Sequence, residues 1–313
     1  MLAEILRRLM ATIPVMAVVA LAVFGLLHLT PGDPAVIIAG DYATTEDIAR
    51  IRTKLGLDRP FLTQVGIWLG QVFRGDLGTS IFSGLPVTKL IGQRAEVTIV
   101  LTLYAMLISV CVGVPLGIVA AWKQGSWLDR VVMIFAVSGF SMPVFWLGFL
   151  LVYVFAISFA WLPVQGYAPL AGGLAGTLRH LTLPAVTLSV VYMALIARMT
   201  RASMLGVLSE DYIRTAFAKG LAPRGVLVRH ALKNASLPVV TIIGIGFALL
   251  IGGAVVTESV FALPGLGRLT VDAIIRRDYP VIQGVILLVS GVYVMINLII
   301  DVLYVVLDPR IRY

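Results

Sequence analysis

The chain has 313 residues, of which 59% are hydrophobic and only 13% are charged. Soluble globular proteins carry about 25% charged residues, so this composition excludes an ordinary soluble protein and predicts an integral membrane protein. The formal net charge of +8 could suggest a nucleic-acid partner, but the basic residues gather in short loops between apolar runs, as membrane topology requires, and we expect no nucleic-acid partner.

The first apolar run extends from about residue 9 to residue 29 and follows Arg7 and Arg8. Its length is close to the roughly 20 residues that cross a bilayer. It therefore predicts an uncleaved first span with its N-terminus inside, and a signal peptide is the alternative.

Residues 30–96 mix polar and apolar positions and contain no further span. Thr44 can cap a helix that Gly56 ends, and Pro60 can start another. The segment therefore predicts an external cap of two or three helices. Its basic residues do not oppose this location, because long loops translocate largely regardless of charge.

Five more apolar runs predict spans at about residues 97–121, 131–160, 181–197, 239–257 and 281–306. The run at 131–160 is long enough to tilt or to be broken near Gly139-Phe140-Ser141-Met142-Pro143. With both termini inside, short cytoplasmic pieces carry thirteen Lys and Arg residues and short external loops carry four. This asymmetry favours six spans with cytoplasmic ends.

A polar loop at residues 198–238 separates the fourth and fifth spans and holds seven basic residues against two acidic ones. Asp211 can serve as the N-cap of a short helix, and Gly220 suits the position just past its end. Pro223 fits the first turn of a second helix that runs to about Asn234. On the first helix an apolar face is formed by Tyr212, Ile213, Ala216 and Phe217, and on the second by Val226, Leu227 and Ala231.

The loop resembles the cytoplasmic "EAA" loop of ABC importer permeases, and most of all the peptide/nickel subfamily, which imports dipeptides, oligopeptides, glutathione or nickel chelates. The resemblance is carried by Asp211-Tyr212-Ile213-Arg214-Thr215-Ala216-Phe217-Ala218-Lys219-Gly220-Leu221, Arg229-His230-Ala231-Leu232-Lys233-Asn234 and Leu237-Pro238. Two departures from the general pattern, Arg214-Thr215-Ala216 in place of Glu-Ala-Ala and a more distant Leu-Pro, also resemble this subfamily. Further matches are Thr30-Pro31-Gly32-Asp33-Pro34-Ala35, Leu55-Gly56-Leu57-Asp58, Gly75-Asp76-Leu77-Gly78, Gly252-Gly253-Ala254-Val255-Val256-Thr257-Glu258 and Asp308-Pro309-Arg310, so the resemblance covers nearly the whole chain.

The resemblance implies an all-α membrane protein with the transmembrane fold of a type I ABC importer. Residues 1–93 would form the first span and external cap, residues 94–307 the transmembrane domain with its coupling loop at 198–238, and residues 308–313 a cytoplasmic tail. In that family the loop docks in a cleft of the ATPase and transmits its motion to the spans. The matching positions are Arg214, Thr215, Ala216, Phe217, Lys219, Gly220, Leu221 and Arg224. The alternative for this loop is a pair of basic amphipathic helices lying on anionic lipid.

The resemblance also implies partners: a second, similar permease, two ATP-binding subunits and an external solute-binding protein, all at the cytoplasmic (inner) membrane of a bacterium or archaeon. The chain would supply half of an alternating-access pathway for peptides. No GxxxxGK[ST] motif occurs, so we expect ATP and magnesium to bind the partner subunits and this chain to have no catalytic residue, cofactor or metal. The alternatives are a self-sufficient secondary transporter or channel and, more distantly, a membrane enzyme.

Candidate pathway residues come from two places. Ser141 and Met142 lie in a soft, partly polar stretch at membrane depth, where backbone groups need partners from protein or water; an ordinary proline kink is the alternative. Glu258 ends the fifth span, where it could face the substrate or an outer gate, or could cap the external segment that follows.

Overall fold

The computed structural model describes residues 2–29, 34–39, 43–54, 56 and 58–307. The predicted tail at 308–313 and residues 30–33 of the first external motif lie outside the described residues. Backbone contacts divide the chain into two units, residues 1–96 with 269–295 (unit 1) and residues 97–268 with 296–313 (unit 2).

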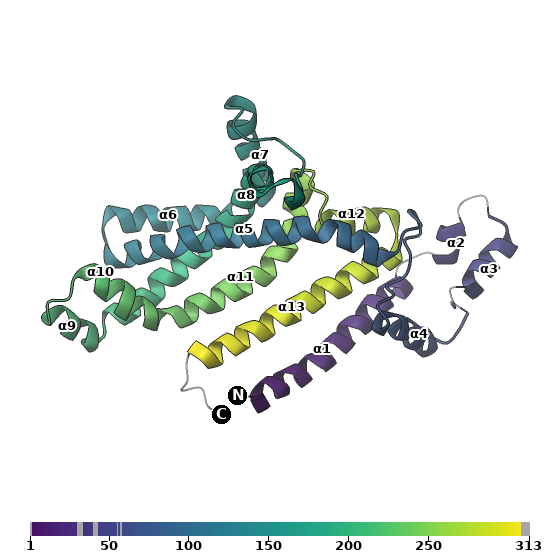
Figure 1. Cartoon of the computed structure of the whole chain (residues 1–313), viewed down its shortest axis with the longest axis horizontal. Coiled ribbons are helices and arrows are strands. Elements are labelled where there is room, and N and C mark those ends of the chain that lie inside the picture. Colours follow the sequence, from purple (N-terminus) through teal and green to yellow (C-terminus); the bar gives the residue numbers. More distant parts are fainter. Residues whose placement is uncertain (1, 30–33, 40–42, 55, 57, 308–313) are drawn as a thin grey trace. The chain divides into compact units, whose positions relative to one another are not determined.

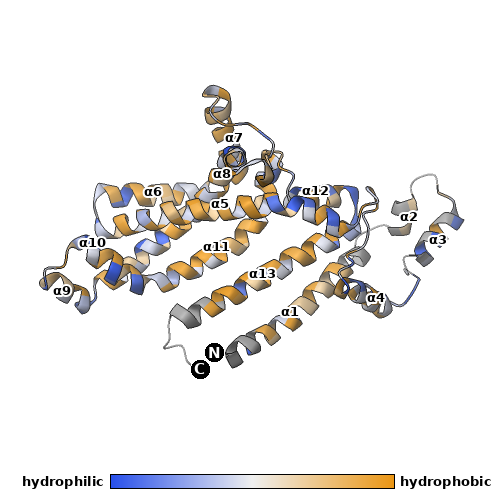
Figure 2. Cartoon of the chain, viewed as in Figure 1, coloured by the Kyte–Doolittle hydropathy of each residue, from blue (hydrophilic) through white to orange (hydrophobic). Residues whose placement is uncertain are grey.

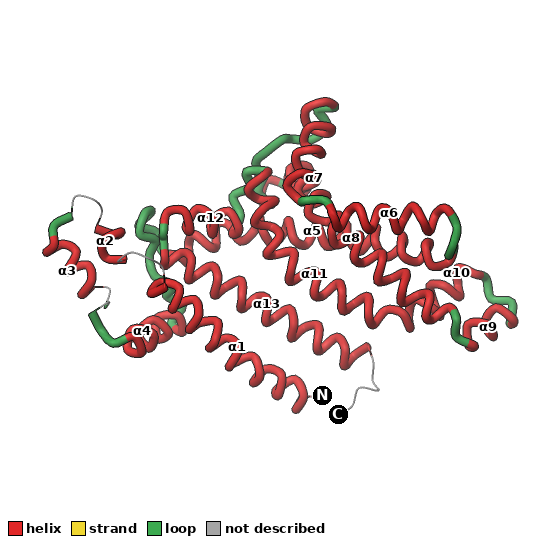
Figure 3. The backbone as a smooth tube through the Cα atoms, turned by 180° about the vertical axis from the view of Figure 1, so that it is seen from behind, coloured by secondary structure: helices red, strands yellow, loops and turns green. Residues whose placement is uncertain are grey.

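Helices form nearly all of the described chain (Figures 1 and 3). In order they are α1 (Leu2–Leu29), α2 (Pro34–Ala39), α3 (Thr45–Lys54), α4 (Phe61–Phe73), α5 (Val87–Trp122), α6 (Trp127–Ser141), α7 (Val144–Leu151), α8 (Leu174–Leu208), α9 (Asp211–Ala218), α10 (Pro223–Gly225), α11 (Leu232–Val260), α12 (Leu266–Arg276) and α13 (Tyr279–Leu307). A 3₁₀ turn forms Leu170–Gly172, and π-helical segments form Val152–Ser158 and Val226–Ala231.

Four helices within the described residues are long and apolar enough to cross a membrane: α5, α8, the continuous helix Pro223–Val260, and Tyr279–Ile300 of α13. Hydrophobic residues run along the length of these helices (Figure 2). α6 and the helix Val144–Ser158 meet at a bend of 108°. If the two together form one broken crossing, they count as a fifth span. The predicted first span falls on α1, whose described apolar stretch, Leu9–Gly25, is shorter. The fold is that of a multi-span helical membrane protein, and the count of six stays a prediction.

Unit 1 contains the helices predicted between the first two spans. The helix expected after Thr44 is α3, Gly56 has the positive φ of +68° that a chain reversal requires, and Pro60 is the residue before α4. α4 packs on α1 through aromatic rings: the ring centroid of Phe24 lies 5.7 Å from that of Phe61 and 5.4 Å from that of Trp68. Helices in this segment are therefore confirmed, while their external location stays a prediction.

α12 (Leu266–Arg276) was not expected from the sequence, which suggested only an external segment after Glu258. Its buried positions Leu266, Leu269 and Ala273 have the three- and four-residue spacing of one helix face. The short segment Leu263-Pro264-Gly265-Leu266-Gly267 hid this periodicity, because turn residues dominate its first half.

α8 packs against α6, α7 and α11, and the buried apolar core of unit 2 is formed mainly by residues of α5, α8 and α11. Its most deeply buried apolar side chains include those of Leu101, Leu181, Leu188, Leu250, Leu263 and Phe261. Glycines let α5 approach α8 closely: a Cβ added to Gly117 would lie 2.5 Å from the Cβ of Thr200 and 2.6 Å from the carbonyl oxygen of Ala197. One turn away, a Cβ on Gly113 would lie 2.9 Å from the carbonyl oxygen of Met193. Small residues four apart are the usual way in which membrane helices pack backbone to backbone.

Candidate functional site

The loop at 198–238 is a continuation of two long helices. α8 extends to Leu208, well past the predicted end of the span at residue 197, and α9 follows after two residues. Pro223 occupies the first turn of α10, as predicted. The predicted helix end near Asn234 was wrong: the chain passes through the π segment directly into α11, and Pro238 is accommodated inside that helix. Helices in membranes tolerate such prolines because neighbouring groups satisfy the freed carbonyl.

The ends of α9 are defined by local chemistry. Asp211 is the first helical residue, and Glu210 occupies the N-cap position that the sequence had suggested for Asp211. At the other end the amide of Gly220 donates to the carbonyl of Phe217 at 2.9 Å, and the amide of Leu221 donates to that of Ala216 at 3.3 Å. This pair of bonds is a Schellman motif, which requires a left-handed residue. Gly220 supplies it with φ +79°.

The inner face of α9 is fixed on a buried apolar cluster at the loop end of unit 2. Ile213 and Ala216 are 1% and 7% exposed. They pack with Ala121 at the end of α5, Met204 of α8 and residues of the π segment and α11, namely Val226, Leu227, Ala231 and Ala235. Full burial of an isoleucine stabilises such packing by about 1.5–3 kcal/mol. α9 is therefore held firmly on the ends of the long helices (Figure 1).

A side-chain hydrogen bond adds to this packing. The amide nitrogen Nδ2 of Asn234 in α11 donates to the hydroxyl of Tyr212 in α9 at 2.7 Å. The predicted apolar face of α9 is thus divided: Ile213 and Ala216 point inward, whereas Tyr212 and Phe217 are 42% and 43% exposed.

The outer side of α9, the turn after it and α10 form a mixed basic and apolar surface, which we call the coupling surface. Of the predicted coupling residues, Ala216 is buried and the others are exposed: Arg214, Thr215, Phe217, Lys219, Gly220, Leu221 and Arg224. Nη1 of Arg214 lies 3.4 Å from a carboxylate oxygen of Asp211. An exposed ion pair of this kind stabilises the fold by at most about 1 kcal/mol, so the guanidinium of Arg214 can readily bind another partner. Aromatic and arginine side chains around an open glycine turn are typical of a protein-docking surface.

The candidate pathway residues Ser141 and Met142 lie at the 108° bend between α6 and α7. The predicted break in this span is therefore confirmed. The hydroxyl of Ser141 donates to the carbonyl of Val137 at 2.9 Å, and both Ser141 and Met142 are exposed in the isolated chain. Ser141 and Met142 line an open hollow together with Ser138, Pro143, Phe145 and Trp146.

Glu258 is fully buried near the end of α11. Its carboxylate accepts a hydrogen bond from the hydroxyl of Thr98 at 2.5 Å and another from the backbone amide of Arg268 at 2.9 Å. The oxygen of Thr98 accepts from the amide of Leu266 at 2.8 Å. Glu258 and Thr98 thus cap the start of α12. This arrangement corresponds to the second alternative for Glu258, in which it caps the segment that follows the fifth span. Gly265 is required beside the carboxylate, since a Cβ there would overlap the carboxyl group.

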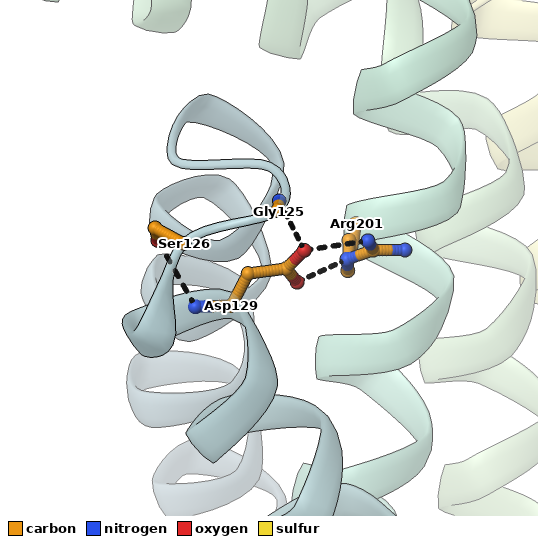
Figure 4. A network of polar contacts seen from close by, with 4 residues as sticks. All are labelled: Gly125, Ser126, Asp129 and Arg201. Carbon is orange, nitrogen blue, oxygen red and sulfur yellow. Dashed lines mark hydrogen bonds and ion pairs between the residues drawn. The ribbon is translucent and has the colours of Figure 1, made fainter.

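An ion pair that sequence reasoning missed joins α6 to α8 (Figure 4). Nε and Nη2 of Arg201 donate to the two carboxylate oxygens of Asp129 at 2.5 and 2.8 Å, and the amide of Gly125 donates to the same carboxylate at 3.0 Å. Asp129 is 4% exposed. The available signal was an acidic residue three positions after Ser126, in an otherwise basic turn; Ser126 caps α6 by accepting from the amide of Asp129.

Both charged groups lie outside the predicted spans, Asp129 in the turn between the second and third spans and Arg201 in the loop at 198–238. The hydrogen bond from Arg201 is the main cause of a lowered pKa at Asp129, although burial acts in the opposite direction. The same bond raises the pKa of Arg201. The pair is therefore ionised, and its charges offset each other at a buried position.

Comparison with known proteins identifies the family. Residues 113–313 match the family model described as a binding-protein-dependent transport system inner membrane component, and residues 1–102 match the model of its N-terminal part. The chain is 55% identical over 309 residues to a probable peptide ABC transporter permease of Sinorhizobium fredii, with 99% of each chain covered. It is 45% identical to a glutathione transport system permease of Salmonella choleraesuis and 42% identical to a dipeptide transport system permease of Alkalihalophilus pseudofirmus, covering all of each.

Solved structures agree on the fold. An inward-facing MetNI methionine ABC transporter is similar with a TM-score of 0.57 at 19% identity, covering 70% of this chain and 96% of that chain. A second crystal form of the same transporter gives a TM-score of 0.58 at 18% identity, covering 71% and 97%. The family models and the relatives above show that the chain belongs to the binding-protein-dependent transport system inner membrane components, the family of the peptide ABC transporter permeases.

Proposed function

We propose that this chain is the permease subunit of an ATP-driven importer and forms half of a translocation pathway for short peptides. The observation that carries the proposal is the coupling surface: an exposed basic and aromatic surface held on the ends of α5, α8 and α11 by a buried cluster. A surface fixed in this way can pass a displacement to several spans at once. Relatives named for peptides, dipeptides and glutathione support a cargo with a peptide backbone.

In this mechanism, ATP binding closes two separate ATPase subunits, the docked loop moves with them, and the spans switch from an inward to an outward opening; hydrolysis resets them. The chain pairs with a second permease and receives cargo from an external solute-binding protein, which sets much of the selectivity. ATP and magnesium bind the ATPases, and this chain has no enzymatic activity of its own. Within the described residues, no group of three or more His, Cys, Asp and Glu side chains is placed to hold a metal ion.

The proposal places residues 198–238 and both termini in the cytoplasm, and the segment between the first two spans outside. Ser83 and Ser209 are exposed in the isolated chain, so single cysteines at these positions in a Cys111→Ala background should be accessible to a reagent. An impermeant maleimide added to intact cells should label Ser83→Cys and leave Ser209→Cys unlabelled until the membrane is opened. Equal labelling of both in intact cells would refute this topology.

The proposal also assigns all ATP hydrolysis to the partner subunits. The purified chain alone should hydrolyse no ATP, whereas the complex that co-purifies with it should hydrolyse ATP faster when its binding protein carries peptide. Hydrolysis is measured as phosphate release from both preparations at equal permease concentration. Robust turnover by the isolated chain would contradict the assignment.

A further inference from the structure

The buried ion pair between Asp129 and Arg201 connects more than two side chains. Asp129 lies in the first turn of α6, and its carboxylate also holds the amide of Gly125 in the turn after α5. Arg201 lies in α8, seven residues before that helix ends at Leu208 and the chain enters α9. One carboxylate thus ties together the loop ends of α5, α6 and α8 (Figure 4).

The neighbouring contacts make this end of unit 2 stiff. α5 touches α8 through Gly117, which packs against Ala197 and Thr200. Ala121, at the end of α5, belongs to the same apolar cluster as Ile213 and Ala216 of α9. A displacement of α9 is therefore imposed directly on α5 and α8.

α6 lies outside this cluster. The residues that pack α9 come from α5, α8, the π segment and α11, while α6 meets α8 through a close contact at Gly139, where an added Cβ would lie 3.0 Å from Cγ1 of Val190. At the end of α6 near the coupling loop, the charged tie to α8 is the Asp129–Arg201 pair. The other end of α6 is the 108° bend beside Ser141 and Met142.

We propose that the Asp129–Arg201 pair is the tie that makes α6 follow the coupling loop, so that motion imposed on α9 reaches the bend at Met142–Pro143. Both are positioning residues for transport, and the inference depends on the proposed function. The bidentate geometry suits this role, because two parallel hydrogen bonds between a planar guanidinium and a carboxylate fix orientation as well as distance. Without the pair, the end of α6 near the coupling loop is held to α8 by packing alone.

The test uses the complex that co-purifies with the chain, reconstituted in proteoliposomes with a mixture of labelled dipeptides to pentapeptides as the probe. Asp129→Asn removes the charge with almost no change in shape, Arg201→Gln removes the donor fork, and Arg201→Lys keeps the charge without the fork. Arg130→Gln is the matched control, because Arg130 is exposed on the same turn of α6 and acts on Asp129 only weakly, through its charge. Permease abundance, ATP hydrolysis and peptide uptake are measured on each preparation.

We expect Asp129→Asn and Arg201→Gln to lower peptides transported per ATP hydrolysed by about tenfold, within the usual range of coupling between sites. Hydrolysis should stay within about twofold of the wild type, and Arg201→Lys should give an intermediate ratio. The double variant Asp129→Asn with Arg201→Gln should have about the same ratio of transport to hydrolysis as either single variant, because both substitutions remove the same interaction. Arg130→Gln should transport normally.

A purely structural pair would lower abundance while leaving the ratio of transport to hydrolysis at the wild-type value, and that result would overturn the inference. If a charge-removing variant fails to accumulate, the ratio measured for Arg201→Lys decides, since that variant retains the ionic attraction. Failure of the wild-type complex to show ATP-driven uptake would instead count against the proposed function. The two failures are therefore distinguishable.

Discussion

Gly117→Ala should destabilise the packing of α5 on α8 by about 3 kcal/mol and deplete the folded protein from the membrane. The added Cβ would lie 2.5 Å from the Cβ of Thr200 and 2.6 Å from the carbonyl oxygen of Ala197. One of these atoms belongs to the backbone of α8 and cannot rotate away. The helices must therefore separate, which also weakens contacts on either side.

Gly92→Ala is the matched control in the same helix, because within the described chain nothing lies within 4 Å of a Cβ added there. Alanine favours a helix over glycine by about 1 kcal/mol, so this control should be neutral or slightly stabilising. Membrane abundance and the temperature at which the detergent-extracted protein aggregates measure the difference. A Gly117→Ala protein as abundant and heat-resistant as Gly92→Ala would show that the close contact does not exist.

Gly220→Val should abolish most transport while leaving the chain inserted and abundant. The left-handed φ of +79° is unfavourable for valine, and the branched side chain would project from the exposed turn of the coupling surface. Within the isolated chain a Cβ at Gly220 meets no described atom inside 4 Å. A collision would therefore arise with a docked partner and not with the permease itself.

Gly75 offers an unusually close control for backbone strain. It follows α4 with φ +80°, its amide donates to Val72, and the next amide, that of Asp76, donates to Gln71, so it ends its helix in the same Schellman motif. A Cβ there also meets open space among the described residues. Gly75→Val and Gly220→Val should thus incur a similar local strain, and only the second should affect ATPase docking.

The sequence could predict features that depend on neighbouring residues. The apolar runs located the long helices, Gly220 located the end of α9 and Pro223 the start of α10, and the stretch at residues 139–143 located the break after α6. Each of these depends on local backbone chemistry, since glycine allows a positive φ and proline lacks an amide hydrogen. The coupling residues were expected from the resemblance to the EAA loop, whose residues are contiguous, and their role in docking stays a prediction.

Contacts between distant residues were beyond such reasoning. Arg201 and Thr98, the side-chain partners of Asp129 and Glu258, are 72 and 160 residues away along the chain, so the burial and roles of the two carboxylates depend on tertiary packing. The end of the second loop helix was misplaced because a proline at residue 238 usually marks a boundary in water but is tolerated within a membrane helix. The division of α9 into a buried and an exposed half likewise required knowing which helices lie beneath it.

The central claim is that residues 198–238 couple this permease to a separate ATPase. Its most direct test is ATP-driven peptide uptake, measured beside the amount of ATPase retained on affinity purification, for Gly220→Val and Gly75→Val at equal membrane abundance. We expect Gly75→Val to retain the ATPase and to transport peptide normally, and Gly220→Val to lose at least about tenfold in uptake, with the ATPase either released or bound but uncoupled. Normal uptake and full ATPase retention in Gly220→Val would contradict the claim.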